Sequence, residues 1–228
     1  MKKYFSDIER DALLVHLVFI ISCFLIIVLP IGIGIGVKLF ILVILYSLLI
    51  VVIGLLRGYK EWIYIWIFVF LISFFQIFPD WILSAELNVL VFPEDGLFKI
   101  GTVSGYMVGL WVIPLFLIIF IGKQLQEHFS EKIAYIAVIL LSLAIFGISE
   151  QSMWMLQSWY AQNVVMIGRV ALYIIIPEII LGLSAYYGYE IIKEKHHLFK
   201  IPVAFFIMIL YLGNAVFYYF IIERVVFV

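Results

Sequence analysis

The chain of 228 residues is 67% hydrophobic and only 13% charged, and its formal net charge is −1. Soluble domains are about 45–50% apolar and about 25% charged, and a chain of this length cannot bury such an apolar excess in a soluble core. The composition therefore excludes a soluble enzyme, a disordered chain and a nucleic-acid binder that relies on a basic face. A polytopic membrane protein remains. The single cysteine, Cys23, also excludes an internal disulfide and any multi-cysteine metal site.

Charges and turn residues divide the chain into seven apolar runs, each close to the ~20 residues that a membrane-spanning helix needs. The first run follows two lysines but has no small-residue cleavage site, so we predict an uncleaved helix rather than a signal peptide. No run alternates with a period of two, which favours a single all-α, seven-helix transmembrane bundle. The predicted spans are 12–30, 38–56, 62–79, 104–122, 132–149, 167–191 and 201–222.

The basic residues predict an orientation. Ten of the fourteen fall on one side of the seven spans, and by the positive-inside rule this side is cytoplasmic. We therefore expect the N-terminus inside and the C-terminus outside, in a bacterial inner membrane. The predicted inner residues are Lys2, Lys3, Arg10, Arg57, Lys60, Lys123, Lys132, Lys193, Lys195 and Lys200, and the outer ones are Lys38, Lys99, Arg169 and Arg224.

Two outer connections, 80–103 and 150–166, are longer than the others and are the usual place for binding or catalytic groups. Within the first, Val89–Phe92 and Leu97–Ile100 flank a Pro-Glu-Asp-Gly turn, which predicts a short hairpin between helices 3 and 4. We expect this hairpin to lie on, or dip into, the outer leaflet.

Acidic and amide side chains gather on the outer side. Asp80 and Glu150 end helices 3 and 5, and Arg169 lies about one turn into helix 6. One interpretation is ordinary solvation with surface ion pairs, which are weak. The other is a polar cup, in which these three residues are candidate catalytic groups. The candidate substrate-binding residues are Glu94, Asp95, Asn88, Tyr106, Trp111 and Asn163.

Glu178 is predicted near the middle of helix 6. An ionisable group at that depth is costly and suggests a function, and burial favours its neutral form. Pro177 lacks an N–H group and predicts a kink beside it. The alternative is a protonated Glu178 that is only hydrogen-bonded within the bundle.

Four segments of the chain form a pattern across helix 3, the outer hairpin and helix 4. They are Phe78–Trp81, Leu90–Gly96, Gly105–Met107 and Leu110–Pro114. Together they resemble carotenoid-modifying integral membrane enzymes of the hydratase and lycopene-cyclase type. The resemblance covers about a fifth of the chain and implies a helix, an outer hairpin and a following helix that frame intramembrane acids. No Glu-Glu pair occurs, so the resemblance does not extend to the cyclases' paired-glutamate motif.

Three functions follow from these features. The preferred one is an intramembrane enzyme in which Glu178 acts as an acid on an isoprenoid or lipid, with the outer carboxylates or Arg169 stabilising charge. The second is a proton- or cation-coupled transporter, although no inverted repeat is visible. The third is a structural or accessory subunit that docks a partner through the outer hairpin.

The sequence shows no evident cofactor and no metal motif, although carboxylates without histidine would suit a hard cation. The expected partners are the lipid bilayer and a hydrophobic small-molecule substrate, with no nucleic acid. The oligomeric state does not follow from the sequence.

Overall fold

The computed structural model describes residues 6–30 and 32–227 of the chain. Lys2 and Lys3, which the predicted orientation uses, lie outside these ranges. Within them, seven helical segments are long and apolar enough to cross a membrane, and each overlaps one predicted span. They indicate a multi-pass membrane protein with an all-α bundle.

The first two spans are single helices, and the third is built from three helical pieces in succession. The fourth and fifth each join a long helix to a short turn of helix. These elements are α1 (Asp7–Val28), α2 (Ile35–Arg57), α3 (Lys60–Phe75), α4 (Ile77–Trp81), the π-helical turn η1 (Ile82–Glu86), α5 (Met107–Leu110), α6 (Val112–His128), α7 (Glu131–Ser152) and the 3₁₀ turn η2 (Met153–Leu156).

The last two spans also begin with short turns, and the seventh ends in one. Their elements are the 3₁₀ turn η3 (Leu172–Ile174), α8 (Ile175–Ile192), the 3₁₀ turn η4 (His197–Phe199), α9 (Lys200–Ile221) and the π-helical turn η5 (Ile222–Val226). Five boundaries differ from the prediction by five residues or more. The first span begins at Asp7 rather than at 12, the fourth ends at His128 rather than at 122, and the fifth ends at Leu156 rather than at 149. The third span continues to Glu86 rather than ending at 79, and the sixth begins at Leu172 rather than at 167.

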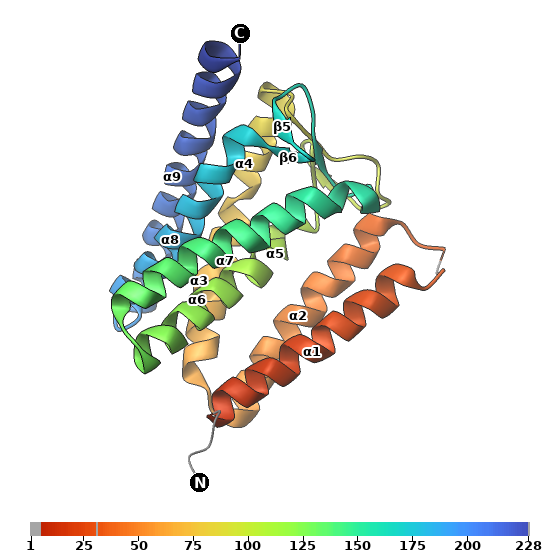
Figure 1. Cartoon of the computed structure of the whole chain (residues 1–228). Coiled ribbons are helices and arrows are strands. Elements are labelled where there is room, and N and C mark those ends of the chain that lie inside the picture. Colours follow the sequence, from red (N-terminus) through yellow and green to blue (C-terminus); the bar gives the residue numbers. More distant parts are fainter. Residues whose placement is uncertain (1–5, 31, 228) are drawn as a thin grey trace.

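The spans alternate in direction, so the bundle has two distinct ends (Figure 1). The "N-terminal end" holds the start of α1 and the turns between α2 and α3, α6 and α7, and α8 and α9. The "hairpin end" holds the remaining connections and the end of α9. Eight basic residues predicted to be cytoplasmic lie at or next to the N-terminal end: Arg10, Arg57, Lys60, Lys123, Lys132, Lys193, Lys195 and Lys200.

Large aromatic side chains fill the centre of the bundle. Tyr46, Trp62 and Phe116 are fully buried and come from α2, α3 and α6, and the ring centroids of Trp62 and Phe116 are 6.0 Å apart. Many large apolar side chains point outward instead, and Leu56 is 77% exposed. An apolar outer surface around an aromatic core is what a bundle in hydrocarbon requires.

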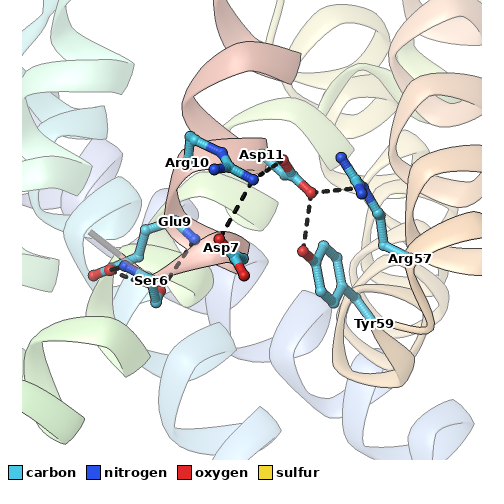
Figure 2. Close-up of polar contacts among 7 residues, drawn as sticks. All are labelled: Ser6, Asp7, Glu9, Arg10, Asp11, Arg57 and Tyr59. Atoms are coloured by element: carbon cyan, nitrogen blue, oxygen red, sulfur yellow. Dashed lines mark hydrogen bonds and ion pairs between the residues drawn. The ribbon is translucent and has the colours of Figure 1, made fainter. Parts of the chain in front are cut away.

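A polar cluster holds the start of α1 against the α2–α3 turn (Figure 2). The Asp11 carboxylate accepts a hydrogen bond from the Tyr59 hydroxyl at 2.9 Å and forms ion pairs with Arg57 at 2.9 Å and Arg10 at 3.8 Å. We call these four residues the Asp11 cluster. Burial, and then the bond to Asp11, raise the pKa of Tyr59 above its ordinary value, so this hydroxyl keeps its proton.

Short strand pairs close the hairpin end, but not in the predicted pairing. β1 (Leu90–Val91) pairs antiparallel with β4 (Tyr160–Ala161), which joins the two long connections to each other. β2 (Lys99–Ile100) pairs with β3 (Val103–Ser104), and β5 (Met166–Ile167) pairs with β6 (Val170–Ala171). The predicted hairpin of Val89–Phe92 with Leu97–Ile100 is therefore wrong, because each half takes a different partner.

Asp95 anchors the first long connection to the start of α2. Its backbone carbonyl accepts a hydrogen bond from the Gly36 N–H at 2.9 Å, and its side chain lies against Gly36. A Cβ atom on Gly34 or Gly36 would overlap the Asp95 carbonyl or carboxyl group. The glycines between helices 1 and 2 thus permit a close approach that larger residues would block.

Candidate functional site

A cavity of about 340 Å³ lies under the strand pairs of the hairpin end. Its wall is apolar apart from a few groups, and all seven spans contribute to it. The carboxyl groups of Asp80, Glu150 and Glu178 are its charged or ionisable acids, and no lysine, arginine or histidine is among the described residues that line it. We call this space the acid cavity.

The three acids lie at one depth. Asp80 is six residues before the end of its span at Glu86, Glu150 is six before Leu156, and Glu178 is six after Leu172. At 1.5 Å per residue, each lies about 9 Å below the hairpin end. Glu178 is also within electrostatic range of both other acids. The three carboxyl groups therefore form one layer, reached from three different helices.

The predicted position of Glu178 near the middle of its helix is wrong. Gly168, whose φ is +65°, makes the turn between β5 and β6, so helix starts only at Leu172 and α8 at Ile175. Glu178 therefore lies in the first turn of α8. Pro177 precedes it in the same turn, where a missing N–H group leaves little unsatisfied. The predicted mid-helix kink has no place in this arrangement.

The acids differ in their hydrogen bonds. The Trp159 indole N–H donates to Glu150 at 2.9 Å, and the Trp111 indole N–H makes a long contact of 3.4 Å with Asp80. Glu178 is only 4% exposed, and no residue that the structure describes forms a hydrogen bond or ion pair with its carboxyl group. The least satisfied acid is thus the one predicted to be the proton donor.

Aromatic rings surround the carboxyl groups. Trp111, predicted as a substrate contact, lines the acid cavity, and its ring centroid lies 6.0 Å from that of Tyr211 on α9. Tyr173 and Trp159 line the cavity too. Sequence reasoning missed Tyr173, Tyr211 and Trp159 as site residues, because aromatic residues occur throughout this chain. Tyr173 and Trp159 carried one signal, a position within a turn of a span boundary, whereas Tyr211 lies in the middle of its span and carried none.

Arg169 is not in this group. It is exposed in the β5–β6 turn, where its guanidinium lies 4.4 Å from the centre of the Trp154 ring and its backbone N–H donates to Gln151. It does not line the acid cavity. The structure therefore gives no support for Arg169 as a group that stabilises charge beside Glu178.

Glu94 and Asp95 have different surroundings, and neither lines the acid cavity. The Glu94 side chain is 90% exposed and pairs with Lys99 at 2.9 Å. Asp95 is 2% exposed and accepts hydrogen bonds from the Leu97 N–H and the Ser104 hydroxyl. Glu94 is thus a surface pair and Asp95 a structural anchor of the first long connection.

The three remaining substrate-binding candidates, Asn88, Tyr106 and Asn163, hold the two long connections of the hairpin end together. The Asn88 carbonyl accepts hydrogen bonds from the side chains of Gln162 and Asn163, at 3.2 and 3.3 Å. Tyr106 is fully buried, and its hydroxyl donates to the Ser158 carbonyl at 3.0 Å. Burial raises the pKa of Tyr106, so the donor is retained. These contacts tie the second long connection to the first and to α5.

Within residues 6–30 and 32–227, no group of three histidine, cysteine, aspartate or glutamate side chains is arranged to hold a metal ion. The ionisable and polarisable groups on the cavity wall are carboxyl groups and aromatic rings. An acid in an apolar, water-poor cavity can donate a proton to a bound molecule, and a second carboxylate can accept one. Aromatic faces stabilise a positive charge that develops between them.

The fold and the site indicate a multi-pass, all-α membrane protein with an acid-lined apolar cavity. Residues 77–222 match the family described as a domain of unknown function (DUF6989), and the chain belongs to this family. The matched part contains all three cavity acids, whereas α1, α2 and α3 precede it. No curated protein and no solved structure matches the chain. The resemblance to carotenoid-modifying enzymes finds no counterpart in these comparisons and stays a prediction.

Proposed function

We propose that the protein is an intramembrane enzyme that acts on a hydrophobic substrate, an isoprenoid or another lipid. The observation that carries this proposal is the layer formed by Asp80, Glu150 and Glu178 on the wall of one apolar cavity. A membrane protein gains no stability from three carboxyl groups without a basic partner, so their retention suggests a chemical role.

In the proposed step, Glu178 is the acid. Its O–H bond breaks and a C–H bond forms at an alkene carbon of the substrate, which leaves a carboxylate and a carbocation. Asp80 or Glu150, as a carboxylate, then removes a proton from a neighbouring carbon and a new double bond forms. The rings of Trp111 and Tyr211 face the charge that develops between these two proton transfers.

The orientation remains part of the proposal. We propose that the N-terminus is cytoplasmic, the C-terminus is external and the membrane is a bacterial inner membrane, which places the acid cavity in the outer leaflet. The basic residues at the N-terminal end support it. A C-terminal reporter that is active in the cytoplasm would contradict this orientation.

The test compares lipid extracts of isolated membranes that contain the wild type, Glu178→Gln or Asp80→Asn, after incubation in deuterated buffer, where lipid biosynthesis no longer adds deuterium to carbon. We expect a lipid species in the wild-type extract that carries carbon-bound deuterium from the donated proton and is lost from both variants. Glu94→Gln is the matched control, because Glu94 is an exposed carboxylate outside the cavity. If the variants yield the same labelled lipids as the wild type, the proposal fails.

The same experiment separates the enzyme from the two other functions. A proton- or cation-coupled transporter would move its substrate without adding deuterium to carbon, and a subunit that only docks a partner would leave the lipid extract unchanged. The cavity at Glu178 favours the enzyme over the accessory subunit, since a docking subunit has no need for an acid-lined interior space.

A further inference from the structure

A second cavity, of about 750 Å³, lies between α1 and α6 toward the N-terminal end. Leu13 and His16 of α1 line one side of it, and Ile121 and Gln124 of α6 line the other. Leu117 lines both this cavity and the acid cavity. The two cavities are therefore adjacent and meet at Leu117. We call the two cavities together the α1–α6 groove.

The groove is long for a bundle of packed helices. Along α1 its lining residues extend from Ile27 in the acid cavity to Glu9 in the second cavity, which is about 27 Å of helix. Helices in contact approach to about 8–10 Å and leave no such space between them. Figure 1 shows α1 beside α2. Of these two helices α2 is the one that packs against α6, since the ring centroids of Tyr46 and Phe116 are 6.2 Å apart.

Contacts at both ends hold α1 in this position. The Asp11 cluster joins the start of α1 to α2 and to the α2–α3 turn (Figure 2). At the other end, the Lys38 ammonium of α2 donates to the carbonyl groups of Ile27 and Leu29, at 3.1 and 2.9 Å. At the N-terminal end α1 also meets α6 directly, since Glu9 pairs with His128 at 2.9 Å. Bonds at both ends therefore hold α1 in place, and the space between α1 and α6 does not result from an unattached helix.

We propose that the α1–α6 groove binds the hydrocarbon chain of a single-chain, membrane-dissolved lipid whose reactive group lies at the acid cavity. The inference rests on the proposed function and names the shape of its substrate. The groove is nearly as long as the ~30 Å hydrocarbon core and about twice one leaflet. It therefore fits one chain longer than those of ordinary bilayer lipids. Its wall along α1 between Ile27 and Leu13 is apolar except for Cys23 and His16, and both ring nitrogens of His16 already have partners in Ala12 and Tyr46.

The sole cysteine provides a direct test, because Cys23 lines the acid cavity and is half-buried. Purified protein is treated with N-ethyl-, N-octyl-, N-dodecyl- and N-hexadecylmaleimide, and labelling is followed by intact mass. All reagents carry the same reactive group, so differences report how well each chain is accommodated. We expect the long-chain reagents to label the wild type well and a charged, water-soluble thiol reagent to label it slowly.

Leu117→Trp places a bulky side chain where the two cavities meet. It should leave N-ethylmaleimide labelling unchanged and reduce labelling by N-hexadecylmaleimide on the order of tenfold. Leu140→Trp is the matched control, because Leu140 is an outward-facing leucine of α7 with 59% exposure and lines neither cavity. Ile121→Trp, inside the second cavity, serves as a second blocking variant if Leu117→Trp does not fold.

The proposal that the groove binds a lipid chain would be overturned if the blocking variants and Leu140→Trp showed the same dependence of labelling on chain length as the wild type. The space between α1 and α6 would then be filled by ordinary lipids of the bilayer. The labelling requires no turnover, whereas the deuterium experiment requires no particular chain length. A failure of the groove therefore leaves the acid chemistry standing, and a failure of the acid chemistry leaves the groove as a lipid-binding site.

Discussion

Asp11 at the N-terminal end and Glu178 at the hairpin end are buried to the same degree, with 5% and 4% exposure, but their surroundings are opposite. Asp11 has a tyrosine donor and an arginine at 2.9 Å, whereas Glu178 has no hydrogen-bond partner among the described residues. The two other cavity acids and two further acids of the N-terminal end show the same contrast. Glu61 and Glu190 pair with Lys123 and Lys193 at the N-terminal end, while the cavity acids have only indole N–H groups.

This difference separates two uses of a buried carboxyl group. A paired acid joins helices, so its removal leaves partners without a counter-charge. An unpaired acid costs stability where it stands, and proteins keep such groups where a function needs them. The comparison predicts that loss of the Asp11 carboxylate destabilises the protein and that loss of the Glu178 carboxyl group leaves its stability nearly unchanged. Each can be measured by equilibrium unfolding of purified protein in mixed micelles.

The largest loss of stability is expected for Asp11→Ala. The substitution removes the acceptor of the Tyr59 hydroxyl and the counter-charge of Arg57. Because the Arg57 side chain is 56% exposed and can be rehydrated, we expect a loss of about 1–3 kcal/mol in the free energy of unfolding, below that of a fully buried pair. Asp7→Ala, in the same turn of α1 but 58% exposed, is the control and should cost less. Equal losses for the two variants would mean that Asp11 stabilises the protein no more than an exposed carboxylate does.

Gly36→Ala should cost about 1–2 kcal/mol, since the new Cβ atom would overlap the Asp95 carboxyl group and force the first long connection away from α2. Gly32→Ala is the matched control, because no atom lies near the place of its Cβ. The expected readout is a lower unfolding midpoint for Gly36→Ala alone. An unchanged midpoint would mean that the connection moves freely over α2.

The helices were predictable because each span is a long apolar run bounded by charges, and this signal needs no knowledge of tertiary contacts. The strand pairing was not. Leu90–Val91 finds its partner in Tyr160–Ala161, about seventy residues away, and no local pattern specifies such a pairing. The turn chemistry of Pro93–Gly96 predicted a hairpin of the strands on either side, but these strands pair with other segments.

The candidate site also has a part that the sequence predicts and a part that it does not. Asp80, Glu150 and Glu178 stood out in the sequence because acids are rare in apolar runs, and the structure brings them to one cavity. The depth of Glu178 depended on whether helix begins before or after Gly168, which hydropathy cannot distinguish. Arg169 was placed with the acids by its neighbours in sequence, yet its exposed turn directs it to Trp154. Side-chain direction at a helix start is the information that the sequence lacks.

Tyr59→Phe should cost about 0.5–1.5 kcal/mol, the contribution of one hydrogen bond to Asp11. The pH dependence has a definite sign. Burial and Asp11 raise the pKa of the Tyr59 hydroxyl, so its contribution is fully present below the ordinary tyrosine pKa of about 10 and is lost as the pH rises through the raised value. The difference in unfolding midpoint between the wild type and Tyr59→Phe should therefore be constant near neutral pH and shrink in strong alkali. Tyr160→Phe, an exposed tyrosine at the other end, should show no such difference.

The smallest effect is expected for Glu178→Gln, and it decides the comparison most directly. Glutamine has nearly the same shape as a protonated glutamate, and no ion pair or hydrogen bond within the described residues is lost. The free energy of unfolding should thus stay within about 0.5 kcal/mol of the wild type or rise slightly. Asp11→Asn is the equivalent exchange at the N-terminal end, and it should be destabilising because it keeps the acceptor for Tyr59 but removes the charge that faces Arg57. If Glu178→Gln were as destabilising as Asp11→Asn, Glu178 would be a structural acid with a partner, and its place as the proton donor of the cavity would be lost.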